Sequence, residues 1–159
     1  MDTGPLLHGL QEARQSFTAL LSRTPDDKLE WTPDTSAEGK PTSTLDIIRH
    51  LIASDLDMKK VVADGVPSEW DPADMEASFH AGPAAEVTDR AELLQILEET
   101  AKEVAAAFEA LPDERWGEAL QMPWGKMSVE AFAWMLVAHW YYHAGQIAYL
   151  QRCWGDVGM

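Results

Sequence analysis

Two histidines near the end of the chain have the spacing of a metal-binding pair. His139 and His143 are four residues apart, so on a helix they lie one turn apart on the same face. Both belong to a seam that recurs at steps of four and three residues: Phe132, Leu136, His139, His143, Gln146 and Leu150. A seam of this kind packs into the interior of a helical bundle. Two imidazoles placed there can bind one metal ion, because burial keeps them neutral and their lone pairs available.

The same pair also has a structural interpretation. Two core histidines can hydrogen-bond to neighbouring groups, as buried polar side chains generally do. Two stacked histidines on an apolar seam both bring polar atoms that need partners, and this favours a ligand between them. The spacing alone leaves both interpretations open.

A third ligand must come from another helix, and His50 is the candidate. Ile47 and Ile48 precede it before Arg49, and Leu51 and Ile52 follow it. On a helical wheel, however, His50 falls at the edge of the apolar stripe. Spacing alone therefore predicts a histidine at the boundary of the core. The remaining two histidines are expected at the surface: His8 near the N-terminus and His80 in a segment with Gly and Pro.

Four stretches with helical periodicity position these residues. They span about residues 6–24, 44–63, 88–111 and 128–153, and segments with Pro, Gly, Asp and Ser separate them. The expected N-caps are Ser43 or Thr44 for the second helix, Thr88 for the third and Ser128 for the fourth. Four helices of about 20 residues predict an all-α protein, a four-helix bundle that forms a single domain over residues 1–159.

The connection at residues 65–87 is long enough to cross the bundle, so the second and third helices are expected to run parallel. No strand pattern is apparent in the sequence. Trp116 and Trp124, which precede the last helix, are candidates for the wall of a pocket mouth. The aromatic residues of the last helix are expected to pack against neighbouring helices or a second subunit.

The charge of the chain excludes several classes of partner. With 27 acidic and 12 basic residues the formal net charge is −15, so the surface should repel nucleic acids and anionic membranes. The single cysteine, Cys153, excludes an intramolecular disulfide and a cysteine-based metal cluster. The N-terminus does not resemble a secretory signal, and no apolar run reaches the ~18 residues of a membrane span. We therefore expect a soluble, cytoplasmic protein.

Three segments carry a pattern in a defined order: Trp31-Thr32-Pro33, the run from Ser43 that ends in Arg49-His50-Leu51, and Pro123-Trp124-Gly125 followed by the H-x3-H-x-G-Q-I ending of residues 139–147. Together they resemble the DinB/YfiT-like superfamily, a metal-binding four-helix bundle whose helices run up-down-down-up. This resemblance implies that His50, His139 and His143 form a metal-binding triad. It also places Gln146 beside the triad, where it orients the site or satisfies a buried backbone group.

The resemblance also implies a chemistry. Three imidazoles on one side of an ion leave positions for water or substrate, and Zn²⁺, Ni²⁺ and Fe²⁺ all accept this ligand set. Members of the superfamily include thiol-dependent S-transferases and a thiol-dependent isomerase. The implied function is a metal-dependent enzyme that transfers a low-molecular-weight thiol, such as bacillithiol or mycothiol, to a small electrophile. The sequence identifies neither the catalytic residues nor the substrate.

Two other functions fit the same residues. A metal-dependent hydrolase would need a carboxylate base near the ion, and Asp57, two turns beyond His50, is the candidate. A non-catalytic, stress-related protein that binds a metal or another ligand is the second alternative. Cys153 lies ten residues past His143, about 15 Å along a helix, and is therefore not expected to act at the metal. A homodimer is expected because relatives often pair and the last helix is aromatic.

Overall fold

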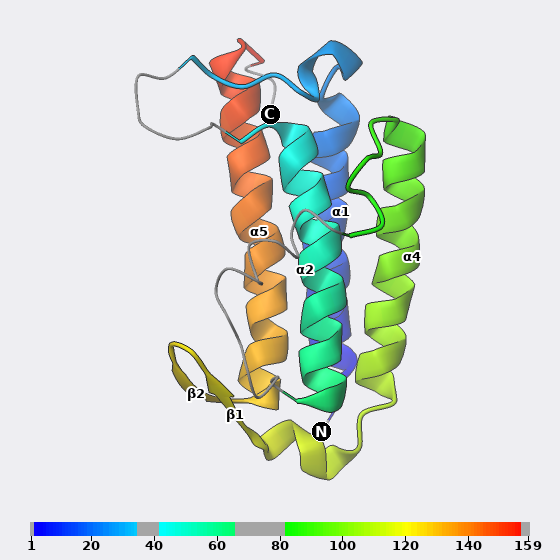
Figure 1. The fold of residues 1–159 in the computed structure, drawn as a ribbon, viewed down its shortest axis with the longest axis vertical. Helices are drawn as coiled ribbons and strands as arrows, with labels where there is room; N and C mark the ends of the chain where they lie inside the picture. Colours follow the sequence, from blue (N-terminus) through cyan, green and yellow to red (C-terminus); the bar gives the residue numbers. More distant parts are fainter. Residues whose placement is uncertain (1, 35–41, 66–81, 157–159) are drawn as a thin grey trace.

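The computed structural model describes residues 2–34, 42–65 and 82–156. Four long helices carry these residues: α1 (Gly4–Arg23), α2 (Thr44–Asp64), α4 (Arg90–Glu109) and α5 (Val129–Cys153). In Figure 1, α1 and α5 run in one direction and α2 and α4 run in the other. The all-α fold and the up-down-down-up order of the four-helix bundle are therefore confirmed. Residues 66–81 of the connection between the parallel helices α2 and α4 lie outside the described residues.

Local hydrogen bonds explain where the helices begin. Ser43 caps α2: its side chain accepts from the backbone N–H of Asp46, and the Asp46 carboxylate accepts from the backbone N–H of Ser43 in return. Ser128 caps α5 as expected. The expected cap of the third helix, Thr88, is wrong. Asp89 caps α4 instead, because its carboxylate accepts from a backbone N–H at 2.9 Å and its charge favours the positive end of the helix.

The bundle core is built from one apolar face of each helix. Along α4 the buried residues recur every three or four positions: Leu93, Leu97, Thr100, Val104 and Phe108. The helices pack most extensively as the pairs α1 with α5 and α2 with α4. Because α2 also packs against α5, side chains of these two antiparallel helices meet across the core.

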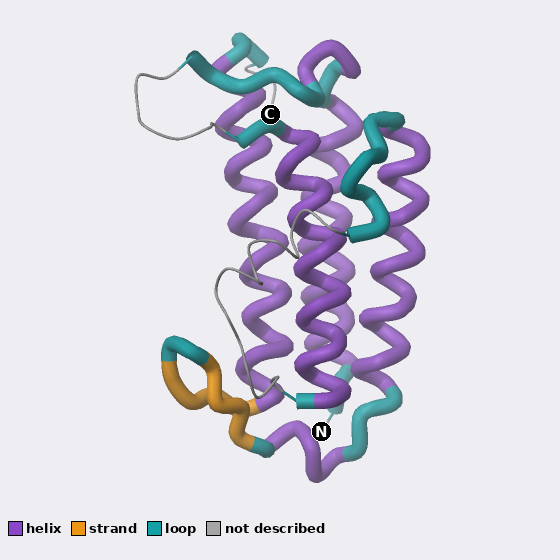
Figure 2. The backbone as a smooth tube through the Cα atoms, viewed as in Figure 1, coloured by secondary structure: helices purple, strands orange, loops and turns teal. Residues whose placement is uncertain are grey.

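The sequence predicts no strands, and this prediction is wrong. Strands β1 (Ala119–Met122) and β2 (Gly125–Ser128) form an antiparallel hairpin just before α5, drawn in orange in Figure 2. Its turn follows Met122 and uses Gly125 at φ +138°, a conformation that favours glycine. Strands of four residues are too short to produce a clear alternating pattern, so the turn is the main sequence signal.

Two tryptophans near the hairpin have different environments. Trp116 lies in the short helix η2 (Asp113–Gly117) and is 2% exposed, with its ring centroid 6.0 Å from that of Phe108. It is therefore a core residue, and its expected place at a pocket mouth is wrong. Trp124 lies at the hairpin turn and is exposed.

No helix in the described part of the chain is long and apolar enough to cross a membrane.

Candidate metal centre

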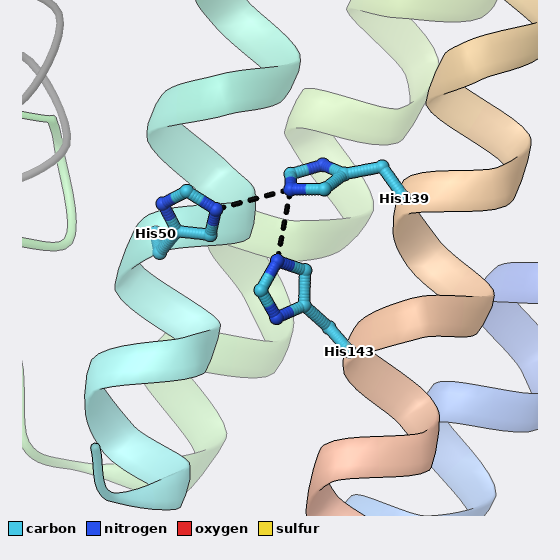
Figure 3. A group of neighbouring side chains, drawn as sticks. All are labelled: His50, His139 and His143. Atoms are coloured by element: carbon cyan, nitrogen blue, oxygen red, sulfur yellow. Dashed lines mark hydrogen bonds between the residues drawn. The ribbon is translucent and has the colours of Figure 1, made fainter. Parts of the chain in front are cut away.

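Three histidines from two helices meet at one point between α2 and α5. Figure 3 shows His50 of α2 facing His139 and His143 of α5. The Nε2 atom of His139 lies 3.0 Å from Nε2 of His50 and 2.8 Å from Nε2 of His143. One ligand atom from each of the three lies within 4.8 Å of the others, so the group could hold a metal ion.

Each helix holds its histidines between buried apolar neighbours. In α5, Leu136 is buried one turn before His139, and Trp140 is buried directly after it. In α2, Ile47 and Leu51 are buried on both sides of His50 along the helix. His50 is itself half-buried, as its place at the edge of the stripe predicts, and this edge faces α5.

Burial controls the charge of the pair on α5. Burial, with smaller contributions from the neighbouring His143 and His50, lowers the pKa of His139 to about 3. Burial also lowers the pKa of His143, against the hydrogen bond from this ring to Gln146, which raises it. Both imidazoles are therefore neutral near pH 7, which is the state that binds a metal ion.

Gln146 sets the orientation of one of these rings. Its Oε1 atom accepts a hydrogen bond from Nδ1 of His143 at 2.6 Å, and its Nε2 donates to the hydroxyl of Tyr142 at 3.2 Å. With the proton on Nδ1, the lone pair of His143 is on Nε2 and points at the other two histidines. The Gln146 side chain therefore contacts the ring of His143 and the hydroxyl of Tyr142.

The nitrogen atoms fit a cation better than they fit one another. A ring nitrogen offers either one N–H or one lone pair, so Nε2 of His139 cannot make well-aligned hydrogen bonds to both neighbours at once. Ligand atoms ~2.1 Å from one tetrahedral ion lie roughly 3.4 Å apart, close to the separations in this cluster. Nδ1 of His139 is buried and has no hydrogen-bond partner among the described residues. A donor set of three imidazoles suits Zn²⁺, Ni²⁺ or Fe²⁺.

Other residues considered from the sequence lie apart from this cluster. His8 is exposed and lies 3.5 Å from Glu12, whereas His80 is outside the described residues. Asp57 has its carboxylate 3.5 Å from the amine of Lys60 and is not part of the group that could hold a metal. Cys153 is exposed at the end of α5.

One polar cluster in the core was missed by the sequence analysis. Asp55 is 1% exposed, accepts from the indole N–H of Trp140 at 2.9 Å and pairs with Arg14 at 2.5 Å. An acidic residue within the apolar face of a predicted helix was the available signal. Its partners, 41 and 85 residues away, could not be identified from spacing.

The amino-acid sequence matches a family model. Residues 10–147 match the model described as the DinB superfamily, a range that contains all three histidines and Gln146. No curated protein sequence matches the chain.

Solved structures with the same fold are distant in sequence. YfiT from Bacillus subtilis, described as a probable metal-dependent hydrolase with an unusual four-helix bundle topology, is 18% identical, covers 95% of this chain and 86% of its own, and has a TM-score of 0.68. A mycothiol-dependent maleylpyruvate isomerase is 12% identical with a TM-score of 0.70; 92% of this chain matches 61% of that one. The colibactin self-resistance protein ClbS, solved in complex with a dsDNA, is 15% identical with a TM-score of 0.70 over 93% of this chain and 94% of its own.

Proposed function

Because this chain belongs to the DinB superfamily, we propose that it is a metal-dependent enzyme in which His50, His139 and His143 hold a divalent ion. The reaction that we assign is the transfer of a low-molecular-weight thiol, of the bacillithiol or mycothiol type, to a small electrophile. The observation that carries the proposal is the convergence of three Nε2 atoms from two helices. The mycothiol-dependent isomerase among the structures of this fold supports a thiol as the cofactor.

The residues of the site each have a part in this reaction. A divalent ion bound there would act as a Lewis acid and lower the pKa of a thiol. His50, His139 and His143 would supply three nitrogen ligands to the ion and leave further positions for the thiol. Gln146 keeps the His143 proton on Nδ1. In the reaction the thiol loses its proton to solvent, its sulfur bonds to an electrophilic carbon, and the leaving group departs with the electron pair of the broken bond.

The overall charge is relevant to the partners. A net charge of −15 attracts metal cations and opposes anionic ligands at long range. It also argues against a nucleic-acid partner for this chain.

We propose a single domain over residues 1–159 that acts on a small molecule in the cytoplasm. We also propose a homodimer, because Tyr141, Tyr142 and Tyr149 of α5 are large and exposed.

The first experiment is metal analysis of protein purified without a histidine tag. Wild type is expected to carry about one divalent ion per chain, and His139→Ala and His143→Ala are expected to lose it, because each removes one of three ligands. His8→Ala is the matched control, since His8 is exposed and outside the cluster. A metal-free wild type, or full metal content in both site variants, would contradict the proposed centre.

The second experiment tests the reaction. The metal-loaded protein is given monochlorobimane with a panel of thiols, and a rate enhancement that a chelator removes is expected with at least one thiol. No enhancement with any thiol would exclude the proposed transfer. Hydrolysis of an ester or amide panel would then support the hydrolase, and inactivity in both assays would support a binding protein. The hydrolase has less support from the structure, because the group that could hold a metal contains no carboxylate among the described residues.

A further inference from the structure

The core cluster of Arg14, Asp55 and Trp140 joins the two helices that carry the histidines. We propose that Asp55 and Trp140 are positioning residues of the metal centre: their hydrogen bond sets the register of α2 against α5 and so holds His50 opposite His139. This inference rests on the proposed function in one respect, namely that the histidines bind a metal ion.

The contact between the two helices is short, directional and buried. The indole N–H of Trp140 donates to Oδ1 of Asp55 at 2.9 Å, and both residues are 1% exposed. Trp140 directly follows His139 in α5, and Asp55 comes five residues after His50 in α2, about 7.5 Å along the helix axis. A sliding movement of α2 that displaces His50 therefore also breaks this hydrogen bond.

Arg14 holds the other side of the carboxylate. Its guanidinium lies 2.5 Å from Oδ2 of Asp55, donates to the carbonyl of Ala101 at 3.3 Å and lies 5.3 Å from the centroid of the Trp140 ring. Asp55 consequently cannot rotate away from the indole without losing its ion pair. Since Ala101 belongs to α4 and Arg14 to α1, the cluster connects all four helices of the bundle.

The indole ring is also held in place. The ring of Phe17 meets it edge to face at 5.0 Å between centroids, and Arg14 covers it from another side. A ring fixed by two neighbours directs its N–H at one point in space, which is what an alignment contact between helices requires.

Stability alone does not account for such a cluster. Replacing a buried ion pair by well-packed apolar residues is often neutral or stabilising, because both charges lose their hydration when they are buried. Hydrogen bonds that are directional and fully desolvated do restrict a core to one arrangement. An arrangement fixed to a few tenths of an ångström is what three ligands from two helices need in order to share one ion.

A pair of tryptophan variants separates positioning from packing. Trp140→Phe removes the N–H that Asp55 accepts and keeps most of the ring. Trp116→Phe is the matched control, because Trp116 is equally buried and its Nε1 has no hydrogen-bond partner among the residues that the structure describes. The probe is Co²⁺, titrated into metal-free protein and followed by its d–d absorption, whose shape reports the coordination geometry.

Trp140→Phe is expected to bind Co²⁺ about 10- to 100-fold more weakly than wild type and to show an altered d–d spectrum, as for the loss of other groups that orient ligands. Trp116→Phe is expected to match wild type within about twofold in affinity, with the same spectrum. A folded Trp140→Phe variant with wild-type affinity and spectrum would overturn the positioning role. Failure of the wild-type protein to bind Co²⁺ would instead overturn the proposed function. This outcome is distinguishable because it is seen in the protein that carries no substitution.

A second pair of variants tests the acceptor and remains informative if Trp140→Phe does not fold. Asp55→Asn keeps an oxygen for the indole N–H, whereas Asp55→Leu does not. We expect the wild-type Co²⁺ spectrum in the Asn variant and an altered spectrum with at least about tenfold weaker binding in the Leu variant. Equal binding by the two variants would overturn the inference, because it would mean that the hydrogen bond to Trp140 does not influence the centre.

Discussion

Two polar clusters among the described residues each join α2 to α5, and their composition differs. In the Arg14–Asp55–Trp140 cluster, donors face acceptors and a positive charge faces a negative one. In the histidine cluster, three ring nitrogens face one another with no opposite charge among them. In the first cluster both carboxylate oxygens of Asp55 have a partner within the protein. The second keeps lone pairs that a cation would satisfy, and this contrast supports the proposal that it binds the metal ion.

The largest expected effect is on the cluster of Arg14, Asp55 and Trp140. Asp55→Ala leaves the Arg14 guanidinium buried without its carboxylate, so we expect a loss of ~3–5 kcal/mol in the free energy of unfolding. Denaturant titration followed by circular dichroism measures this loss. Glu103→Ala is the control: its ion pair with Lys59 also joins two helices but is partly exposed, so its loss should cost at most ~1 kcal/mol.

Similar losses in the two variants would contradict the comparison. They would mean that Asp55 contributes no more to the free energy of unfolding than a surface carboxylate does. The measurement uses metal-free protein, so that a change in metal binding does not contribute to the free energy.

The contrast between the clusters also shows what the sequence can predict. The spacing of His139 and His143 identifies them as a pair because both lie on one helix, where geometry depends on local periodicity. His50 was a boundary histidine by spacing and a ligand only by resemblance to the superfamily, because its approach to α5 depends on how two distant segments pack. Asp55 and Arg14 could not be paired from sequence for the same reason. The hairpin before α5 was missed because its strands are only four residues long.

The next effect is the change of folding stability with pH, which has opposite signs for the two clusters. The pKa of His139 in the folded protein is about 3, below its ordinary value of 6.5. Between these values the unfolded chain binds a proton that the folded chain does not, so stability falls as the pH is lowered from about 6 to about 4. The slope should approach ~1.4 kcal/mol per pH unit for this proton. For Asp55, burial raises the pKa against the effect of Arg14, so its contribution has the opposite sign.

Denaturant titrations of metal-free protein at several pH values measure this slope. His139→Gln removes the titrating ring, and the variant should therefore lose less stability than wild type over the same range. Parallel curves for the two proteins would show that His139 is protonated as readily in the folded state as in the unfolded state, contrary to a buried neutral imidazole.

A smaller effect separates two glutamines of α5. Gln146→Leu removes the acceptor of the His143 ring proton, and we expect metal affinity to fall about 10- to 100-fold with little change in stability. Gln151 is 3% exposed and donates to the carbonyl of Leu20 at 2.7 Å. Gln151→Leu should therefore cost ~1–3 kcal/mol of stability and leave metal affinity unchanged. Isothermal titration with Zn²⁺ measures the metal affinity of both variants, and thermal unfolding measures their stability. A loss of metal affinity in Gln151→Leu, or unchanged metal affinity in Gln146→Leu, would contradict these roles.

The smallest expected effect is at Tyr142, where the histidine cluster meets solvent. Its hydroxyl accepts from Nε2 of Gln146 at 3.2 Å, but the side chain is 63% exposed, so water can replace the hydroxyl in Tyr142→Phe. Metal affinity should fall by no more than about threefold, and Tyr149→Phe, also exposed, should not change it. Because Tyr142 acts on the metal through Gln146, its substitution should have no further effect in a Gln146→Leu background. An additional loss in that double variant would mean that Tyr142 reaches the ion or its ligand directly, and the contact between its ring and that of His143, 5.0 Å between centroids, would then belong to the site itself.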